Sequence, residues 1–169
     1  MQITRQAHLT EQQFLGCVSA FVDALAGELN SAAMYLRKLD GAGKGAAFAF
    51  EMSLDRHRYG ALTVLDRWST LVAAFGPHVK LGRYQQIIDE APARVTAAET
   101  MLTRANELID AAESYSTEVI EAALLAWQAV AATFAEEYRS ADQSAKLGPM
   151  LPDEFKEARA TFLRDLSAR

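Results

Sequence analysis

The sequence predicts an all-α fold, an antiparallel bundle of four long helices followed by a short C-terminal helix. Most of the 9 glycines and 4 prolines among the 169 residues lie near 41–45, 76–82 and 148–152, where they indicate helix ends. Between these clusters Ala, Leu, Glu, Gln and Arg dominate, and these residues favour helices. Apolar residues recur there at steps of three and four, which is the spacing of one helical face. Alternating β-branched runs that would indicate strands are absent.

The first helix is expected over 10–39. Thr10 and Gln13 have the spacing of a capping box, in which each side chain binds a backbone amide of the first turn. The apolar face consists of Phe14, Val18, Phe21, Leu25, Leu29, Ala32, Leu36 and Leu39. In the next segment, Asp40–Gly45, Gly45 stands where a phosphate-binding loop needs Ser or Thr, so we interpret this segment as a helix end and a hairpin turn.

The second helix is expected over 46–75. Its core stripe is predicted to be Phe48, Leu54, Leu62, Leu65, Trp68, Val72 and Phe75. A polar cluster interrupts this stripe, with Glu51, Asp55 and Arg58 on one face at i, i+4 and i+7. That spacing fits either surface ion pairs or a functional site. If the protein contacts a partner or ligand outside its core, we expect the contact residues to be Arg56, His57, Arg58 and Tyr59.

The third helix is expected over 81–113 and has a coiled-coil-like heptad pattern. Val95, Leu102 and Ile109 occupy one core position of this pattern. Small residues recur every seven residues at the other core position, at Ala91, Ala98, Ala105 and Ala112. A column of alanines lets a neighbouring helix come close, so we predict a tight helix seam, either within the chain or between two copies. Pro92 interrupts the run and predicts a kink or a restart near Asp89–Pro92.

A fourth helix is expected over 116–146, separated from the third by a break at Ser114–Thr117. Ser and Thr favour N-caps, and Glu118 then lies in the first turn, where the helix dipole favours acidic residues. Against the break, Asp110 and Glu113 would lie at a helix C-terminus, the unfavourable end of the dipole for an acid.

The last element is a short helix at 153–167, after a linker at 147–152. Asp153 is predicted to cap it. We treat residues 1–169 as one domain with an N-terminal arm at 1–9.

Composition limits the classes of function. With 22 acidic and 17 basic side chains, the net charge is −5, which disfavours binding to nucleic acids. The single Cys17 cannot form an internal disulfide and is expected in the core. No Glu-x-x-His pair and no Cys-x-x-Cys-His motif occurs, so we expect no metal centre, haem or other cofactor. No apolar run spans a bilayer and no leader is evident, which favours a cytoplasmic protein. Abundant Ala, and Arg in preference to Lys, indicate a GC-rich, bacterial genome.

The leading functional hypothesis is a non-enzymatic protein–protein interaction protein: an adaptor, chaperone, immunity or assembly subunit. Phe50, Tyr59, Leu124 and Leu125 lie off the main stripes, and such wide apolar faces favour a protein partner or a homo-oligomer. The alternative is a ligand-binding or enzymatic bundle with an apolar pocket near Arg56–Tyr59. A third hypothesis rests on Tyr138-x-x-x-Asp142, which resembles the export signal of type VII secretion substrates and implies a secreted helical protein. The Trp-x-Gly turn that accompanies this signal is missing.

Overall fold

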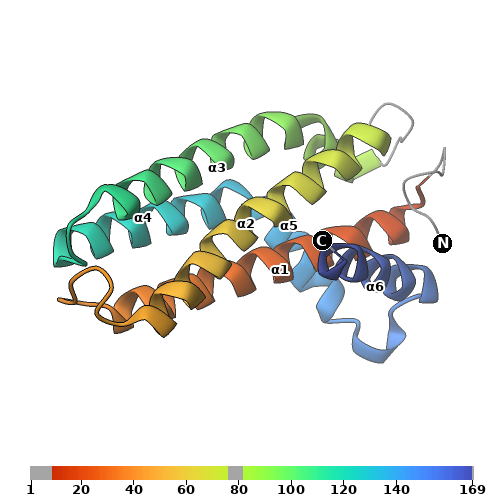
Figure 1. Cartoon of the computed structure of the whole chain (residues 1–169). Coiled ribbons are helices and arrows are strands. Elements are labelled where there is room, and N and C mark those ends of the chain that lie inside the picture. The colour runs from red at the N-terminus through yellow and green to blue at the C-terminus, as the bar shows by residue number, and fades with distance from the viewer. Residues whose placement is uncertain (1–8, 76–81, 169) are drawn as a thin grey trace.

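The computed structural model describes residues 9–75 and 82–168 and confirms an all-α bundle (Figure 1). Its helices are α1 (Glu11–Lys38), α2 (Phe48–Phe75), α3 (Gln85–Ala111), α4 (Thr117–Thr133), α5 (Ala135–Ala145) and α6 (Asp153–Ser167). Two 3₁₀ turns, η3 (Gly82–Tyr84) and η4 (Gly148–Met150), precede α3 and α6. Within the described residues, β structure is limited to one isolated bridge between Gly43 and Ser114.

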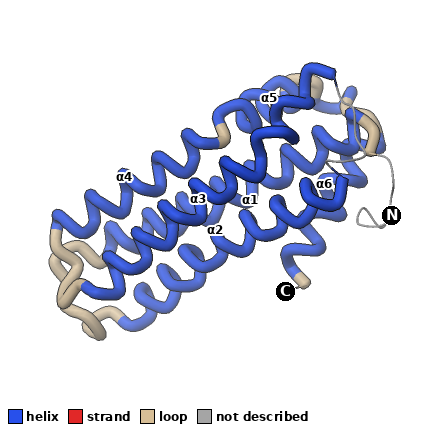
Figure 2. Tube along the Cα trace, turned by 90° about the horizontal axis from the view of Figure 1, so that it is seen from above, coloured by secondary structure: helices blue, strands red, loops and turns tan. Residues whose placement is uncertain are grey.

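Two antiparallel hairpins, α1–α2 and α3–α4, lie side by side along the long axis of the bundle (Figures 1 and 2). α1 also packs against α5 and α6, so it is covered on several sides. Gly16 makes the contact with α6 possible, because a Cβ atom there would lie 2.3 Å from the carbonyl oxygen of Phe155. Any other residue at position 16 would force α6 away from α1.

The core is centred on the N-terminal half of α1. All nine residues from Phe14 to Val22 are buried, as expected of a helix segment that neighbours surround. Phe21 stacks on Trp68 of α2 at 4.7 Å between ring centroids and meets Phe134 edge-on at 5.0 Å. Cys17 lies in this segment, and burial raises the pKa of its thiol to about 12, which confirms that it is a core residue.

Two of the predicted helix starts are confirmed in detail. The Thr10 hydroxyl accepts a hydrogen bond from the Gln13 amide at 3.1 Å, and the Gln13 side chain accepts one from the Thr10 amide at 3.0 Å. α3 and α4 are separate helices, since Ser116 caps α4 by accepting a hydrogen bond from the Val119 amide at 3.3 Å. The N-terminal arm (apart from Leu9) and Leu81, the predicted start of the third helix, lie outside the described residues.

Two expectations about helix continuity and one about a helix cap need correction. The segment 116–146 is not one helix, because α4 and α5 meet at an angle of 65°. The Thr133 hydroxyl donates to the Ala129 carbonyl at 2.8 Å, which favours bending, and the next residue, Phe134, is fully buried in the core. The prediction that a new helix starts near Asp89–Pro92 is wrong, since α3 continues through Pro92. At α6, Pro152 occupies the N-cap position and Asp153 lies in the first turn.

Among the described residues, no single helix combines the length and the apolar character of a membrane span. α4 and α5 meet that criterion only when their two segments are joined across the 65° bend.

The alanine column of α3 lies in the core of the chain itself. Ala91, Ala98 and Ala105 are buried, and the helix packs against α2 and α4. Ala112 is half-buried, because it is the residue after the last helical turn. Three of the four alanines are thus buried within one chain, and we predict that they form a tight seam with a neighbouring helix of that chain.

Replacing Ala105 with Leu should lower the free energy of unfolding by about 1–3 kcal/mol, because the seam has no room for a larger side chain. The exposed neighbour Ala97 provides the control, since Leu is nearly as good a helix former as Ala. Urea unfolding at two protein concentrations measures both variants. Equal stability of Ala105→Leu and Ala97→Leu would contradict the seam, and a loss that depends on concentration would place it between copies.

Candidate functional site

The four residues from Arg56 to Tyr59 occupy one turn of α2, and their side chains lie on different sides of the helix. Successive residues of a helix lie about 100° apart, so four in a row cannot share a face. Arg58 and Tyr59 contact α3, whereas His57 contacts α1. Arg56 is exposed and lines a groove together with His57. The predicted cluster is thus divided between an interhelical network and a groove.

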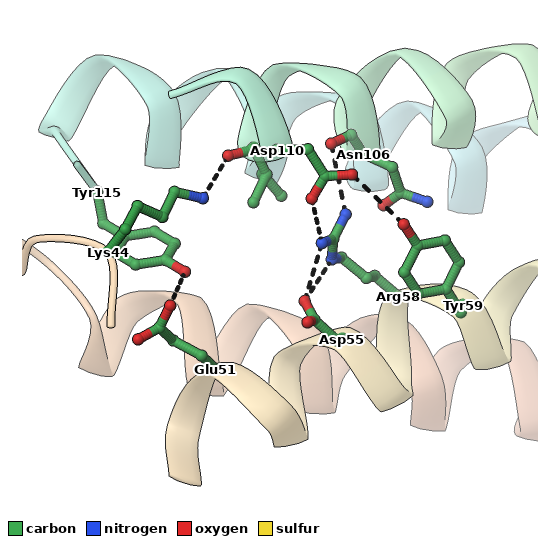
Figure 3. A network of polar contacts seen from close by, with 9 residues as sticks. Lys44, Glu51, Asp55, Arg58, Tyr59, Asn106, Asp110 and Tyr115 are labelled. Carbon is green, nitrogen blue, oxygen red and sulfur yellow. Dashed lines mark hydrogen bonds and ion pairs between the residues drawn. The ribbon is translucent and has the colours of Figure 1, made fainter. Parts of the chain in front are cut away.

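Arg58 is the centre of the network (Figure 3). It is only 4% exposed, and its guanidinium donates to Asp55 Oδ1 at 3.0 and 2.8 Å and to Asp110 Oδ1 at 2.5 Å. A fourth contact reaches the backbone carbonyl of Asn106 at 3.4 Å. Burial by itself would lower the pKa of Arg58, but the hydrogen bonds with Asp110 and Asp55 outweigh it and raise that pKa. The hydrogen bond from Arg58 lowers the pKa of Asp110.

A second part of the network joins the two loops at the same end of the bundle (Figure 3). Tyr115 exchanges backbone hydrogen bonds of 2.9 Å with Gly41 and Ala42, and its hydroxyl donates to Glu51 at 2.8 Å. Lys44 donates to the Ile109 carbonyl at 2.5 Å. A cation at the C-terminus of α3 offsets the negative end of its dipole.

These contacts explain how α3 can end next to acidic residues, which the sequence analysis treated as unfavourable at a helix C-terminus. Asp110 does lie near a helix C-terminus, but Arg58 and Lys44 from the other hairpin supply the compensating positive charge. The spacing of Glu51, Asp55 and Arg58 suggested either ion pairs or a functional site, and here these residues join α2 to α3 and to the 112–116 loop. The guanidinium of Arg58 is engaged by hydrogen bonds within the chain. Of the four predicted contact residues, Arg56, His57 and Tyr59 therefore remain accessible to a partner or ligand.

A groove of about 630 Å³ lies between α1, α2 and the end of α6, and we call it the His57 groove. Its lining residues are Ala24, Gly27, Glu28, Ser31, Arg56, His57, Gly60, Thr63, Val64, Leu163, Leu166 and Ser167. His57 Nδ1 lies 2.8 Å from Glu28 Oε2, and Tyr35 stacks on the imidazole at 5.8 Å. Within the described residues, Arg56 has no ion-pair partner, so its charge is available to a ligand.

Two glycines in helix interiors give this groove its shape. A glycine there costs about 1 kcal/mol relative to alanine, so each needs a reason. At Gly60 a Cβ atom would lie 2.6 Å from Glu28 Oε2, so the missing side chain makes room for the Glu28–His57 pair. At Gly27 no atom lies within 4 Å of such a Cβ, so this position opens the groove wall without serving the packing.

The outer α2 face, which we define as Phe48, Met52, Asp55, Arg56 and Tyr59, is the second accessible feature. Phe48, Met52 and Tyr59 are 69%, 57% and 48% exposed. Their spacing places them within about 40° of one another on the helix, opposite its core-facing side. Over its first three turns α2 therefore exposes large apolar side chains, and nothing in the described residues covers them.

Phe48 was assigned to the core stripe on sequence grounds, and that assignment is wrong. The step of six from Phe48 to Leu54 does not fit a helical face, which is the signal that could have revealed the error. The observed core residues of α2 are Leu54, Ala61, Val64, Leu65, Trp68, Leu71 and Val72. Leu62 is only half-buried.

Comparisons of the chain with protein-family models, with curated proteins and with solved structures give no match. In residues 9–75 and 82–168, no three His, Cys, Asp or Glu side chains are grouped in a way that could hold a metal ion. The two residues of the proposed export signal lie one turn apart on α5, where Tyr138 is half-buried and Asp142 is exposed. The accessible features of the Arg56–Tyr59 turn are thus the His57 groove and the outer α2 face.

Asp110→Asn should lower the free energy of unfolding at pH 7 by about 1 kcal/mol, a modest loss because the carboxylate is half exposed. The folded-state pKa of Asp110 lies below its ordinary value of 3.8, so the contribution of its charge is complete above that value. It is lost as the pH falls through the lowered pKa. Urea unfolding should therefore show the same difference in unfolding free energy between the unaltered chain and Asp110→Asn from pH 7 down to about pH 4. Towards about pH 3 this difference should become smaller. A difference that grows in acid would contradict this assignment.

Proposed function

We propose that the protein is a non-enzymatic helical interaction protein that pairs with a second copy of itself through the outer α2 face. The observation that supports this proposal is the exposure of Phe48, Met52 and Tyr59 in a line on α2, on the side opposite its buried residues Leu54 and Ala61. Large apolar side chains gathered on one face are typical of interaction surfaces.

The outer α2 face is complementary to itself. In an antiparallel pair centred between Asp55 and Arg56, Met52 of one copy lies opposite Tyr59 of the other. Asp55 then lies opposite Arg56 of the second copy, and the two-fold axis repeats both contacts. Arg58 binds only Oδ1 of Asp55, which leaves Oδ2 for an ion pair across the interface. Arg56 has no competing partner among the described residues.

The contact is small for a stable dimer, which usually buries about 1,200–2,000 Å² in total. One helix face with three apolar anchors and two ion pairs is typical of weak, reversible association. We therefore expect a concentration-dependent dimer.

Sedimentation velocity over a range of protein concentrations tests the proposal. The unaltered chain should shift from monomer to dimer as its concentration rises. Arg56→Glu should abolish the dimer, because it places two acids opposite each other, and Met52→Ser should weaken it at least tenfold. Leu125→Ser is the matched control, since Leu125 is 65% exposed on α4, and it should leave the dimer unchanged. A chain that stays monomeric throughout, or a dimer that Arg56→Glu does not affect, would overturn self-pairing through α2.

A second candidate function is supported by the His57 groove. Its unpaired Arg56 and the open wall at Gly27 suit a small organic anion. The Glu28–His57 pair also has the arrangement of a general base that a carboxylate orients, which keeps the enzymatic alternative open. On this hypothesis the accessible part of the Arg56–Tyr59 turn binds a metabolite.

Gly27→Leu tests this second function by filling the groove. The variant should be more stable than the unaltered chain by up to about 1 kcal/mol, because leucine favours a helix over glycine and no atom lies within 4 Å of the added Cβ. Native mass spectrometry of the purified protein should show a retained small molecule that the variant lacks. Retention of the same molecule by Gly27→Leu would contradict a ligand in this groove.

A further inference from the structure

A second groove, of about 530 Å³, lies on the other side of α1 from the His57 groove, where α4 and α5 meet at 65°. We call it the Trp127 groove. Its lining residues are Ala26, Leu29, Asn30, Ala33, Arg37, Leu124, Trp127, Gln128, Ala131 and Tyr138. Its walls come from three helices that the fold holds together independently of the outer α2 face.

The charge of this lining differs from that of the chain. The protein carries 22 acidic residues and a net charge of −5, yet none of the ten lining residues is acidic. Arg37 is the one cation of the lining, and within the described residues it has no ion-pair partner. Apolar side chains make up most of the remaining wall. The groove therefore suits a ligand with a single negative charge and an apolar body.

Two hydrogen-bond donors of the lining have no acceptor among the residues that the structure describes. Trp127 is only 3% exposed, and its indole N–H is buried without a partner. The hydroxyl of Tyr138 is likewise buried and unpaired. Burial, and to a lesser extent the charge of Asp23, raises the pKa of Tyr138 to about 12, so this hydroxyl keeps its proton at neutral pH. Both donor atoms are enclosed by protein, so the indole N–H of Trp127 can report on a ligand in the groove without binding it directly.

We propose that the Trp127 groove binds an amphipathic carboxylate, such as a medium-chain fatty acid. The carboxylate pairs with Arg37, and the apolar chain packs along Leu29, Leu124 and Ala131. A monoanion matches the single arginine, whereas a phosphate dianion would need further positive charge. This inference does not depend on self-pairing, because the groove contains no residue of the outer α2 face.

The two tryptophans of the chain allow a direct test with sodium decanoate. The protein labelled with ¹⁵N gives one indole N–H signal from each of them, and Trp127→Phe assigns the pair. Trp68 serves as an internal reference, since it is also buried and unpaired but lines none of the grooves described above. Decanoate should shift the Trp127 signal to saturation and leave the Trp68 signal in place.

Matched variants and ligands make the test specific. Arg37→Gln should weaken decanoate binding at least tenfold, whereas Lys38→Gln, which removes the neighbouring exposed cation, should not. Decanol, the uncharged analogue, should bind at least tenfold more weakly. Gly27→Leu should leave the titration unchanged, which separates this site from the His57 groove. No shift up to millimolar decanoate, an equal shift of both indoles, or binding that is indifferent to Arg37 would overturn the proposal.

Discussion

The structure depends on the complete burial of the first half of α1. Nine consecutive residues, Phe14 to Val22, are buried, so neighbouring segments must cover α1 on every side. The helices α2, α5 and α6 pack against it. Gly16 permits the closest of these contacts by letting the Phe155 carbonyl reach the backbone of α1. The short C-terminal helix is thus not an appendage of a four-helix bundle, because without it the face of α1 around Gly16 would be open to water.

The second constraint is the electrostatic joint between the two hairpins. Arg58 is buried, and a buried cation is tolerated only where carboxylates and carbonyls surround it. Its partner Asp110 belongs to α3, so the network fixes how α3 lies against α2 and brings the loops at that end together through Tyr115. By holding Arg58 inward, the same contacts set the rotation of α2, which turns Met52 and Tyr59 outward.

Much of the fold could be predicted because its signals are local. The Thr10–Gln13 capping box, the Ser116 cap and the alanine column of α3 depend on residues a few positions apart. The rest depends on contacts between distant segments. Asp110, the partner of Arg58 on α3, lies 52 residues away, and no spacing rule reveals it. The exposure of Phe48 follows from the rotation of α2, and the Trp127 groove follows from a bend without any glycine or proline to mark it.

The bend between α4 and α5 affects both the packing of the core and the shape of the proposed ligand site. Phe134, the residue between α4 and α5, meets Phe21 edge-on in the core, and α5 departs from the direction of α4 at this point. Bending at Thr133 places Phe134 in the core and turns α5 towards α1, so that Tyr138 and Trp127 come to line one groove. The bend that accompanies this apolar contact therefore also forms the Trp127 groove. A ligand in this groove would stabilise the bent arrangement itself, since it would contact α1, α4 and α5 together.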